Sequence, residues 1–339
     1  GLLVGVLALN ALLPSPQLWV IYVVAMLFAA VDGLQRPSLD AMLPRLVPQD
    51  QLSAASALNS LRMNSAALAG PALGGLLISI WGVAAAYAFD IITFCIAIAV
   101  FVRLPSVRAA ATTTQSSVRH VWSGMRYAWS RKDILGSYTI DLAAMTFAFP
   151  FALFPFIAQQ FDAPWALGLL YSAGFAGGLV FGLTSGWTTR IPHYGRAIAF
   201  AAAAWGAAVA LVGLAPGIWW ALGLLAIAGY FDMLSGHFRS LMWNQSIPDD
   251  VRGRMAGIEM LSYSIGPMLG QVRSTTAAQA FGLRTSLASG GILCIAAVGV
   301  TCVTLPALWI FDARTDPHVA ARRRAQLDTS SSSDDAEDA

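Results

Sequence analysis

The chain is organised by long apolar stretches that recur from one end to the other. Short breaks that contain polar residues, Pro or Gly separate ten of them. These stretches cover residues 1–13, 18–43, 52–80, 83–102, 134–157, 165–187, 197–215, 218–243, 255–281 and 287–311. Crossing the hydrocarbon core of a bilayer takes about 20 predominantly apolar residues in a helix. The pattern therefore predicts ten membrane helices, of which the first is short.

The composition fits such an arrangement and excludes a water-soluble fold. Hydrophobic residues make up 57% of the chain and charged residues only 11%, whereas an ordinary soluble domain has roughly 25% charged residues. Lipid offers no hydrogen-bond partners to the backbone, so membrane segments are helices or strands of a closed barrel. These stretches are far too long for barrel strands. We expect an all-α membrane protein.

The positions of the basic residues orient this bundle, although the net charge of +2 says little by itself. Threading ten helices alternately through a membrane places fifteen Lys and Arg residues on one side and only Arg284 in a loop on the other. Loops rich in Lys and Arg stay in the cytoplasm. The C-terminus is therefore expected to be cytoplasmic.

A polar stretch between the fourth and fifth apolar segments divides the chain. We expect an N-terminal helical bundle at 1–103, a cytoplasmic linker at 104–133, a C-terminal helical bundle at 134–312 and a disordered cytoplasmic tail at 313–339. The acidic, serine-rich end of that tail predicts disorder.

The later part of the linker has the spacing of an amphipathic surface helix. Its apolar residues recur at helical spacing, while Arg119, Arg126 and Arg131 can reach water and lipid headgroups. A simple connector is the alternative interpretation.

An internal repeat appears when the sequence is shifted by 200 residues. Eight identities result, pairing Asp32, Leu34, Met42, Pro48, Asp50, Leu61, Gly70 and Gly82 with Asp232, Leu234, Met242, Pro248, Asp250, Leu261, Gly270 and Gly282. Internal repeats are typical of transporters. The same shift leaves residues 134–187 without counterparts, so we expect the chain to hold helices 3–12 of a six-plus-six protein. We also expect that this fragment alone does not transport.

The stretch Gly70-Pro71-Ala72-Leu73-Gly74-Gly75 resembles the antiporter motif of proton-coupled drug exporters in the major facilitator superfamily. Small residues let helices approach closely, and proline bends a helix by removing a backbone donor. The longer family motif has further glycines upstream, where this chain has Ala57 and Ala66. Ordinary small-residue packing is the alternative.

Further motifs resemble the branch of that superfamily that contains enterobactin exporters and macrolide-type efflux proteins. They lie at 36–37, 43–48, 57–60, 124–127, 141–144, 150, 152–155, 183–186 and 252–254. The resemblance implies a multi-pass transporter of the bacterial inner membrane that exchanges a siderophore or amphiphilic drug for protons. It also implies a monomer that needs no cofactor and binds no nucleic acid. An importer or a lipid transporter without proton antiport is the alternative within this fold.

Charged side chains in the apolar stretches are the candidates for proton coupling or for a central cavity. A charge at the bilayer centre costs about 2.5–3.5 kcal/mol on insertion scales, so its presence needs a reason. Because burial favours the protonated form of a carboxylate, such an acid can load and release a proton. The candidates are Asp32, Arg36, Asp141, Asp232, Arg239, Glu259 and Arg273. Purely structural ion pairing is the alternative for each acid.

Aromatic residues supply candidates for lining an apolar substrate cavity, namely Phe147, Phe149 and Phe154.

The remaining chemistry of the chain argues against other functions. The four histidines are too dispersed for a metal site, and the three cysteines lie within apolar stretches, where a thiol acts as a small hydrophobe. A membrane sensor or an enzyme subunit is a remote alternative, because the sequence shows no nucleophile motif or nucleotide-binding loop.

Overall fold

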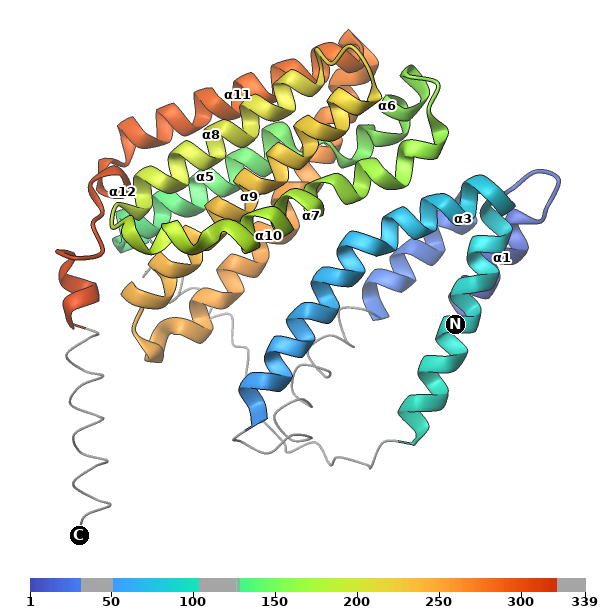
Figure 1. Ribbon diagram of the computed structural model, residues 1–339, viewed down its shortest axis with the longest axis horizontal. Coiled ribbons are helices and arrows are strands. Elements are labelled where there is room, and N and C mark those ends of the chain that lie inside the picture. Colours follow the sequence, from blue (N-terminus) through green and yellow to red (C-terminus); the bar gives the residue numbers. More distant parts are fainter. Residues whose placement is uncertain (32–50, 104–125, 127–128, 322–339) are drawn as a thin grey trace. The chain divides into compact units, whose positions relative to one another are not determined.

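The structure is a computed structural model that describes residues 1–31, 51–103, 126 and 129–321. Every regular element in this part of the chain is an α-helix or a 3-10 helix (Figure 1). Within these residues, six helices are long and apolar enough to cross a membrane, and two shorter apolar ones, Leu2–Ala11 and Leu18–Val31, accompany them. The predicted all-α membrane fold is confirmed.

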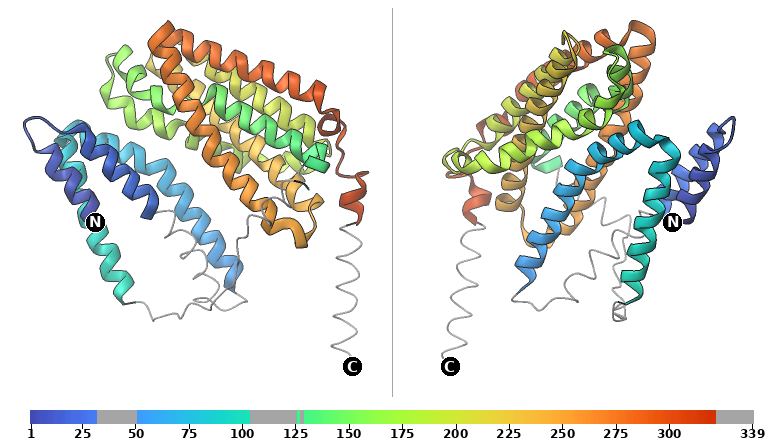
Figure 2. Two further views of the ribbon diagram at one scale, coloured as in Figure 1. Left: turned by 180° about the vertical axis from the view of Figure 1, so that it is seen from behind. Right: turned by 45° about the vertical axis from the view of Figure 1, so that its right-hand side comes forward.

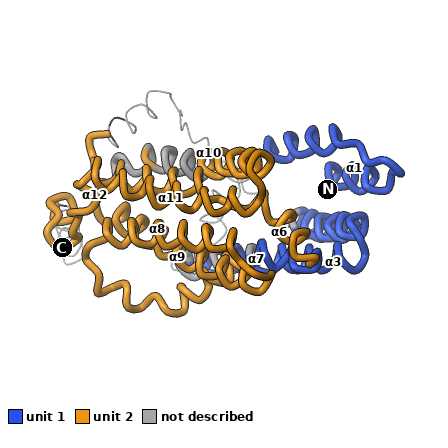
Figure 3. Tube along the Cα trace, turned by 90° about the horizontal axis from the view of Figure 1, so that it is seen from above, with its two compact units in different colours: residues 1–114, 164–172 blue, residues 115–163, 173–339 orange. Residues whose placement is uncertain are grey.

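The chain folds into two compact units, one of residues 1–114 and 164–172 and one of residues 115–163 and 173–339 (Figure 3). Unit 1 contains α1 (Leu2–Ala11), the helix Leu18–Val31 and α3 (Leu52–Val102). The turn after α1 is closed by Asn10, which is 5% exposed. Its Nδ2 donates to the Gln17 carbonyl at 3.2 Å and its Oδ1 accepts from the Gln17 N–H at 2.9 Å.

α3 is two helices rather than one, because Gly82 interrupts it with φ 80° and ψ 174°. That backbone region is essentially accessible only to glycine. The break falls between the predicted stretches 52–80 and 83–102. Gly282, the repeat counterpart of Gly82, has φ 86° and ψ 160° between α10 (Asp249–Phe281) and α11 (Leu283–Thr304). They are the only described glycines with positive φ, which supports the internal repeat.

Unit 2 holds most of the second half of the chain. Besides α10 and α11, its elements are α5 (Lys132–Ala148), η2 (Phe151–Leu153), α6 (Phe154–Gln160), most of α7 (Leu167–Thr184), η4 (Ser185–Arg190), α8 (Tyr194–Val212), α9 (Ile218–Ser246) and α12 (Pro306–Ile310). A short 3-10 turn, η3 (Pro164–Ala166), precedes α7 and belongs to unit 1.

α5 lies at the centre of unit 2, in contact with α8, α9, α10, α11 and α12 (Figure 1 and Figure 2). More than half of its residues are buried, among them the charged Asp133 and Asp141. α8 in turn contacts both α9 and α11. A polar side chain on α5 is therefore surrounded by other helices rather than by lipid.

Glycines allow several of these helices to approach closely. A Cβ atom on Gly177 of α7 would collide with the Ala226 carbonyl of α9, and one on Gly229 of α9 would collide with the Gly174 carbonyl of α7. Small residues at a helix crossing are the common means of packing helices in membranes. The α7–α9 contact is consequently a direct backbone contact.

The outer surface of the helices is strongly apolar. Large hydrophobic side chains stand exposed along the long helices, for example Leu183 at 80%, Val303 at 81% and Leu73 at 58%. Exposed apolar side chains on this scale fit a lipid environment.

Two expectations for the polar segments need correction. Arg131 does not reach water or headgroups but is 6% exposed, paired with Asp133 at 2.7 Å. Its pairing with a neighbouring acid and a helix-end carbonyl compensates its burial. In the described part of the tail, residues 313–321, Val319 is 2% exposed and Asp316 Oδ1 accepts from its N–H at 3.1 Å. Ala313, at 4% exposed, and Val319 are therefore packed, while the acidic end at 329–339 lies outside the described residues.

Candidate functional site

A buried ion pair joins two helices of unit 2. Arg239 Nη1 on α9 lies 2.7 Å from Asp141 Oδ2 on α5, and the two side chains are 10% and 4% exposed. In a low dielectric an ion pair is strongly favoured over two separate charges, but desolvation offsets much of the gain. A charged pair kept here therefore needs a reason beyond stability.

Asp232 adds a third charge to this pair. It stands seven residues before Arg239 on α9, two turns along the same helix, and interacts electrostatically with both Arg239 and Asp141. Two carboxylates and one guanidinium carry a net charge of −1 when all three are ionised. A single bound proton brings this net charge to zero. We call Asp141, Asp232 and Arg239 the charge cluster.

The structure thus brings together three of the seven predicted charged candidates. Asp232 and Arg239 lie two turns apart on α9, whereas the direct ion pair of Arg239 is with Asp141 on α5. Asp32 and Arg36 lie outside the described residues, as does the side chain of Glu259.

Arg273 lies apart from the charge cluster, near the turn between α10 and α11. Its Nη2 donates to the Ser286 carbonyl at 3.1 Å. The guanidinium packs over Gly290, where an added Cβ would also meet the Phe147 carbonyl at 2.5 Å. Its buried Nε has no hydrogen-bond partner among the described residues. In this arrangement Arg273 ties α10 to α11 beside the end of α5.

The predicted substrate-lining aromatic residues lie where α5 gives way to α6. The rings of Phe149 and Phe151 stack with centroids 4.4 Å apart, and Phe151 is 5.1 Å from Phe154. Phe154 is only 1% exposed, so its ring is part of the packed core of unit 2. Phe147 and Phe149 are half-buried. Phe151 was not among the predicted residues, and its ring lies between those of Phe149 and Phe154.

The antiporter-like motif lies within α3, with Pro71 inside the helix. An added Cβ on Gly75 would meet the backbone of Gly168 at 2.7 Å, and one on Gly168 would collide with the Pro71 carbonyl. Both contacts are within unit 1. Gly70 and Gly74 have open space at the corresponding position. Within the motif, Pro71 and Gly75 therefore make the close contact, whereas Gly70 and Gly74 do not.

Two further contacts, one polar and one aromatic, were not predicted from the sequence. His237 Nε2 on α9 lies 3.2 Å from Thr188 Oγ1 in η4. Thr188 donates its own proton to the Ser185 carbonyl at 2.7 Å, so its oxygen accepts from the histidine.

Tyr138 and Trp243 flank the charge cluster, with ring centroids 6.0 Å apart. The spacing of Tyr138 from Asp141 and of Trp243 from Arg239, one helical turn in each case, was a signal available in the sequence.

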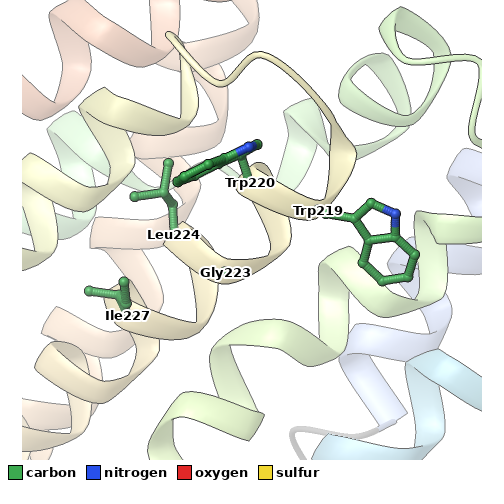
Figure 4. A pocket seen from close by; sticks show the side chains of 5 residues that line it. All are labelled: Trp219, Trp220, Gly223, Leu224 and Ile227. Atoms are coloured by element: carbon green, nitrogen blue, oxygen red, sulfur yellow. The ribbon is translucent and has the colours of Figure 1, made fainter.

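No three His, Cys, Asp or Glu side chains gather into a metal-binding group within the described residues. An apolar hollow on the described surface has a volume of about 280 Å³ and is lined by Trp219, Trp220, Gly223, Leu224 and Ile227. All five residues belong to the first half of α9, and Trp220 lies beside Leu224 while Trp219 points to another side of the helix (Figure 4). This hollow is far along α9 from Arg239.

A protein-family model described as transmembrane secretion effector, within the major facilitator superfamily, matches residues 2–331. The chain therefore belongs to this family, which comprises multi-pass membrane transporters rather than enzymes. The predicted superfamily is thus confirmed.

Among curated proteins, the chain is similar to enterobactin exporters named EntS. It is 27% identical over 268 residues to that of Shigella dysenteriae serotype 1, which covers 78% of this chain and 64% of the relative. The EntS proteins of Shigella boydii serotype 18 and Escherichia coli O157:H7 are 27% and 26% identical over the same shares. The chain thus spans 64% of the length of these relatives.

Proposed function

We propose that the intact protein is a secondary transporter that exports a siderophore or an amphiphilic drug in exchange for protons by alternating access. The observation that carries the proton coupling is the charge cluster, in which Asp141 and Arg239 pair at 2.7 Å with Asp232 within electrostatic reach. An ionisable group inside a membrane bundle is by default a candidate for a proton relay.

The charge cluster has two acids that can compete for one base. In the observed state Arg239 pairs with Asp141. Protonation of Asp141 removes this partner and leaves Arg239 to pair with Asp232 on its own helix. Because α5 and α9 then lose their direct ionic contact, proton binding and release shift the balance between two arrangements of the bundle.

The substrate class is supported by the relatives and by the sequence motif. The relatives carry the name enterobactin exporter, which favours export of a siderophore, and the motif at Gly70–Gly75 resembles that of drug exporters. The half-buried rings of Phe147 and Phe149 suit an aromatic or amphiphilic substrate. We place the protein in the bacterial inner membrane as a monomer, with its C-terminus in the cytoplasm.

The test is accumulation of a fluorescent amphiphilic drug and of a catecholate siderophore in cells that express the intact protein, with and without a protonophore. We expect lower accumulation than in cells without the protein, and loss of that difference with the protonophore. Asp141→Asn and Asp232→Asn should each abolish it as well. Asp162→Asn is the matched control, because Asp162 is an exposed acid in a loop of the same unit.

Two results would contradict the proposal. Unchanged accumulation of both compounds would exclude siderophore and broad drug export and favour an importer or a lipid transporter. Export that persists with the protonophore and in both Asn variants would exclude the charge cluster as the coupling site.

A further inference from the structure

α5 and α9 meet along a layered seam at the end of unit 2 where α5 begins and α9 ends, which we call the linker end. The first layer is the Asp141–Arg239 ion pair. One turn closer to the linker end, Tyr138 and Trp243 pack edge to face with an interplanar angle of 87°. Residues three or four apart share one face of a helix, so these pairs stack along the same seam.

The next layer is aliphatic and fully buried. Ile134 on α5 and Ile247 after α9 are 2% and 0% exposed, and they pack with Met255 of α10, which is also 0% exposed. Tyr138 and Trp243 lie against this cluster. The charge cluster is therefore separated from the linker end by one aromatic and one aliphatic layer.

A last ionic layer closes the seam at the linker end. Arg131 holds both carboxylate oxygens of Asp133, at 3.0 and 2.7 Å, and its Nη1 donates to the Ser246 carbonyl at 3.1 Å. The arginine thereby binds a carbonyl of the last turn of α9, where a cation is favoured by the helix dipole. It fixes the start of α5 to the end of α9.

A small cavity of about 10 Å³ lies between these layers and is lined by Ile134, Ser137, Tyr138, Arg239, Met242 and Trp243. A cavity needs roughly 10–15 Å³ and a few polar partners to hold a water molecule. Ser137 and Arg239 supply polar groups in its wall. Among the described residues of the seam, this is the place where a water molecule fits next to Arg239.

We propose that Tyr138 and Trp243 form the gate that separates the charge cluster from the linker end, and that water enters through the cavity beneath them when the rings part. The role of this gate, which is to admit protons to Asp141, rests on the proposed function. The existence of the gate rests only on the packing of the two rings. The two rings block the seam in the observed state, and the cavity lies on the path between the charge cluster and the aliphatic layer.

Thiol accessibility at Ser137 tests the gate without depending on transport. Ser137→Cys is introduced into the intact protein after Cys95, Cys294, Cys302 and any other cysteine are replaced by Ala. A membrane-impermeant thiosulfonate is applied to inside-out vesicles and to whole cells. With the native rings we expect slow labelling from either side. Trp243→Ala should accelerate labelling about tenfold or more in inside-out vesicles only, since these expose the cytoplasmic face.

Further variants make the result decisive. Tyr138→Ala should act in the same direction, whereas Trp243→Phe keeps an aromatic ring and should restore slow labelling. Trp219→Ala is the matched control, because Trp219 lies on the same helix but is 68% exposed near its other end. An unchanged labelling rate in both Ala variants, or equal acceleration from the two sides, would overturn the gate.

Failure of the gate and failure of proton coupling give different results. Faster labelling of Trp243→Ala together with normal export by Asp141→Asn would establish the gate and refute the coupling role of the charge cluster. Unchanged labelling together with loss of export by Asp141→Asn would do the reverse.

Discussion

Asp141 and Arg239 meet at 2.7 Å in the interior of unit 2 and are held by different helices, α5 and α9. The ion pair thus crosses from one helix to the other. The contact therefore links a titratable side chain on α5 directly to α9. This relationship makes the pair a candidate for the coupling site and sets the first two predictions.

Breaking the pair on one side should destabilise the bundle more than removing it altogether. Asp141→Asn/Asp232→Asn leaves the guanidinium of Arg239 without either carboxylate of the charge cluster, and uncompensated buried charges cost about 3–5 kcal/mol. The triple variant Asp141→Asn/Asp232→Asn/Arg239→Gln has no charge left in the cluster and should recover part of this loss. Equilibrium unfolding of the purified protein in detergent measures both. A triple variant that is less stable than Asp141→Asn/Asp232→Asn would contradict this prediction.

Asp232→Asn should separate function from stability. The variant removes one of the two carboxylates but keeps the Asp141–Arg239 pair, so we expect no loss of stability from a broken ion pair. Protonophore-sensitive export should nevertheless be lost. Thermal unfolding and export are measured on the same preparations. A strongly destabilised variant would show that Asp232 has a structural role instead.

The close contact between α7 and α9 predicts that Gly177 cannot be enlarged. In Gly177→Ala the new methyl group collides with the Ala226 carbonyl, and overpacking of this kind costs about 1–3 kcal/mol. Gly182→Ala on the same helix is the control, because nothing lies within 4 Å of its added Cβ. Similar unfolding midpoints for the two variants would show that α7 and α9 do not meet this closely.

Gly82 and Gly282 should be equally sensitive to substitution although both have free space around them. Each adopts a positive φ, of 80° and 86° respectively, and an alanine there carries backbone strain of about 1–3 kcal/mol. Gly223→Ala serves as the control. It lies in α9 with nothing within 4 Å, where alanine should stabilise the helix by about 0.5–1 kcal/mol. If Gly82→Ala and Gly282→Ala unfold like Gly223→Ala, the two breaks are not shared features of the repeat.

The motif in α3 should tolerate substitution at Gly70 and Gly74 but not at Gly75. Gly75→Ala brings a methyl group to 2.7 Å from the backbone of Gly168, whereas Gly70→Ala and Gly74→Ala meet open space. We expect export to fall at least tenfold in Gly75→Ala, a loss that corresponds to about 1.4 kcal/mol. In Gly70→Ala export should remain within about twofold, because the new methyl group meets open space. Initial export rates at equal protein levels decide this. Equal rates would refute a special role for Gly75.

Much of the fold could be predicted because the bilayer imposes a single rule on apolar stretches. All ten predicted segments contain helix in the described structure, and the boundary at Gly82 was found to within a few residues. The candidate site was predicted only in part. The charged residues were recognised one by one, since any charge in an apolar stretch stands out, but Tyr138 and Trp243 resembled the surrounding apolar residues.

The sequence by itself determined the class of fold and the superfamily, and it predicted the internal repeat and the set of membrane charges. These depend on composition, on local spacing and on glycines whose backbone conformation no other residue adopts. Only the tertiary structure decided that Arg239 pairs with Asp141 rather than with Asp232, that Arg131 is buried, and that the rings of Tyr138 and Trp243 pack together beside Arg239. The reason is physical: a side chain on a helix can reach several neighbours, and the packing of α5 against α9 selects which of them it meets.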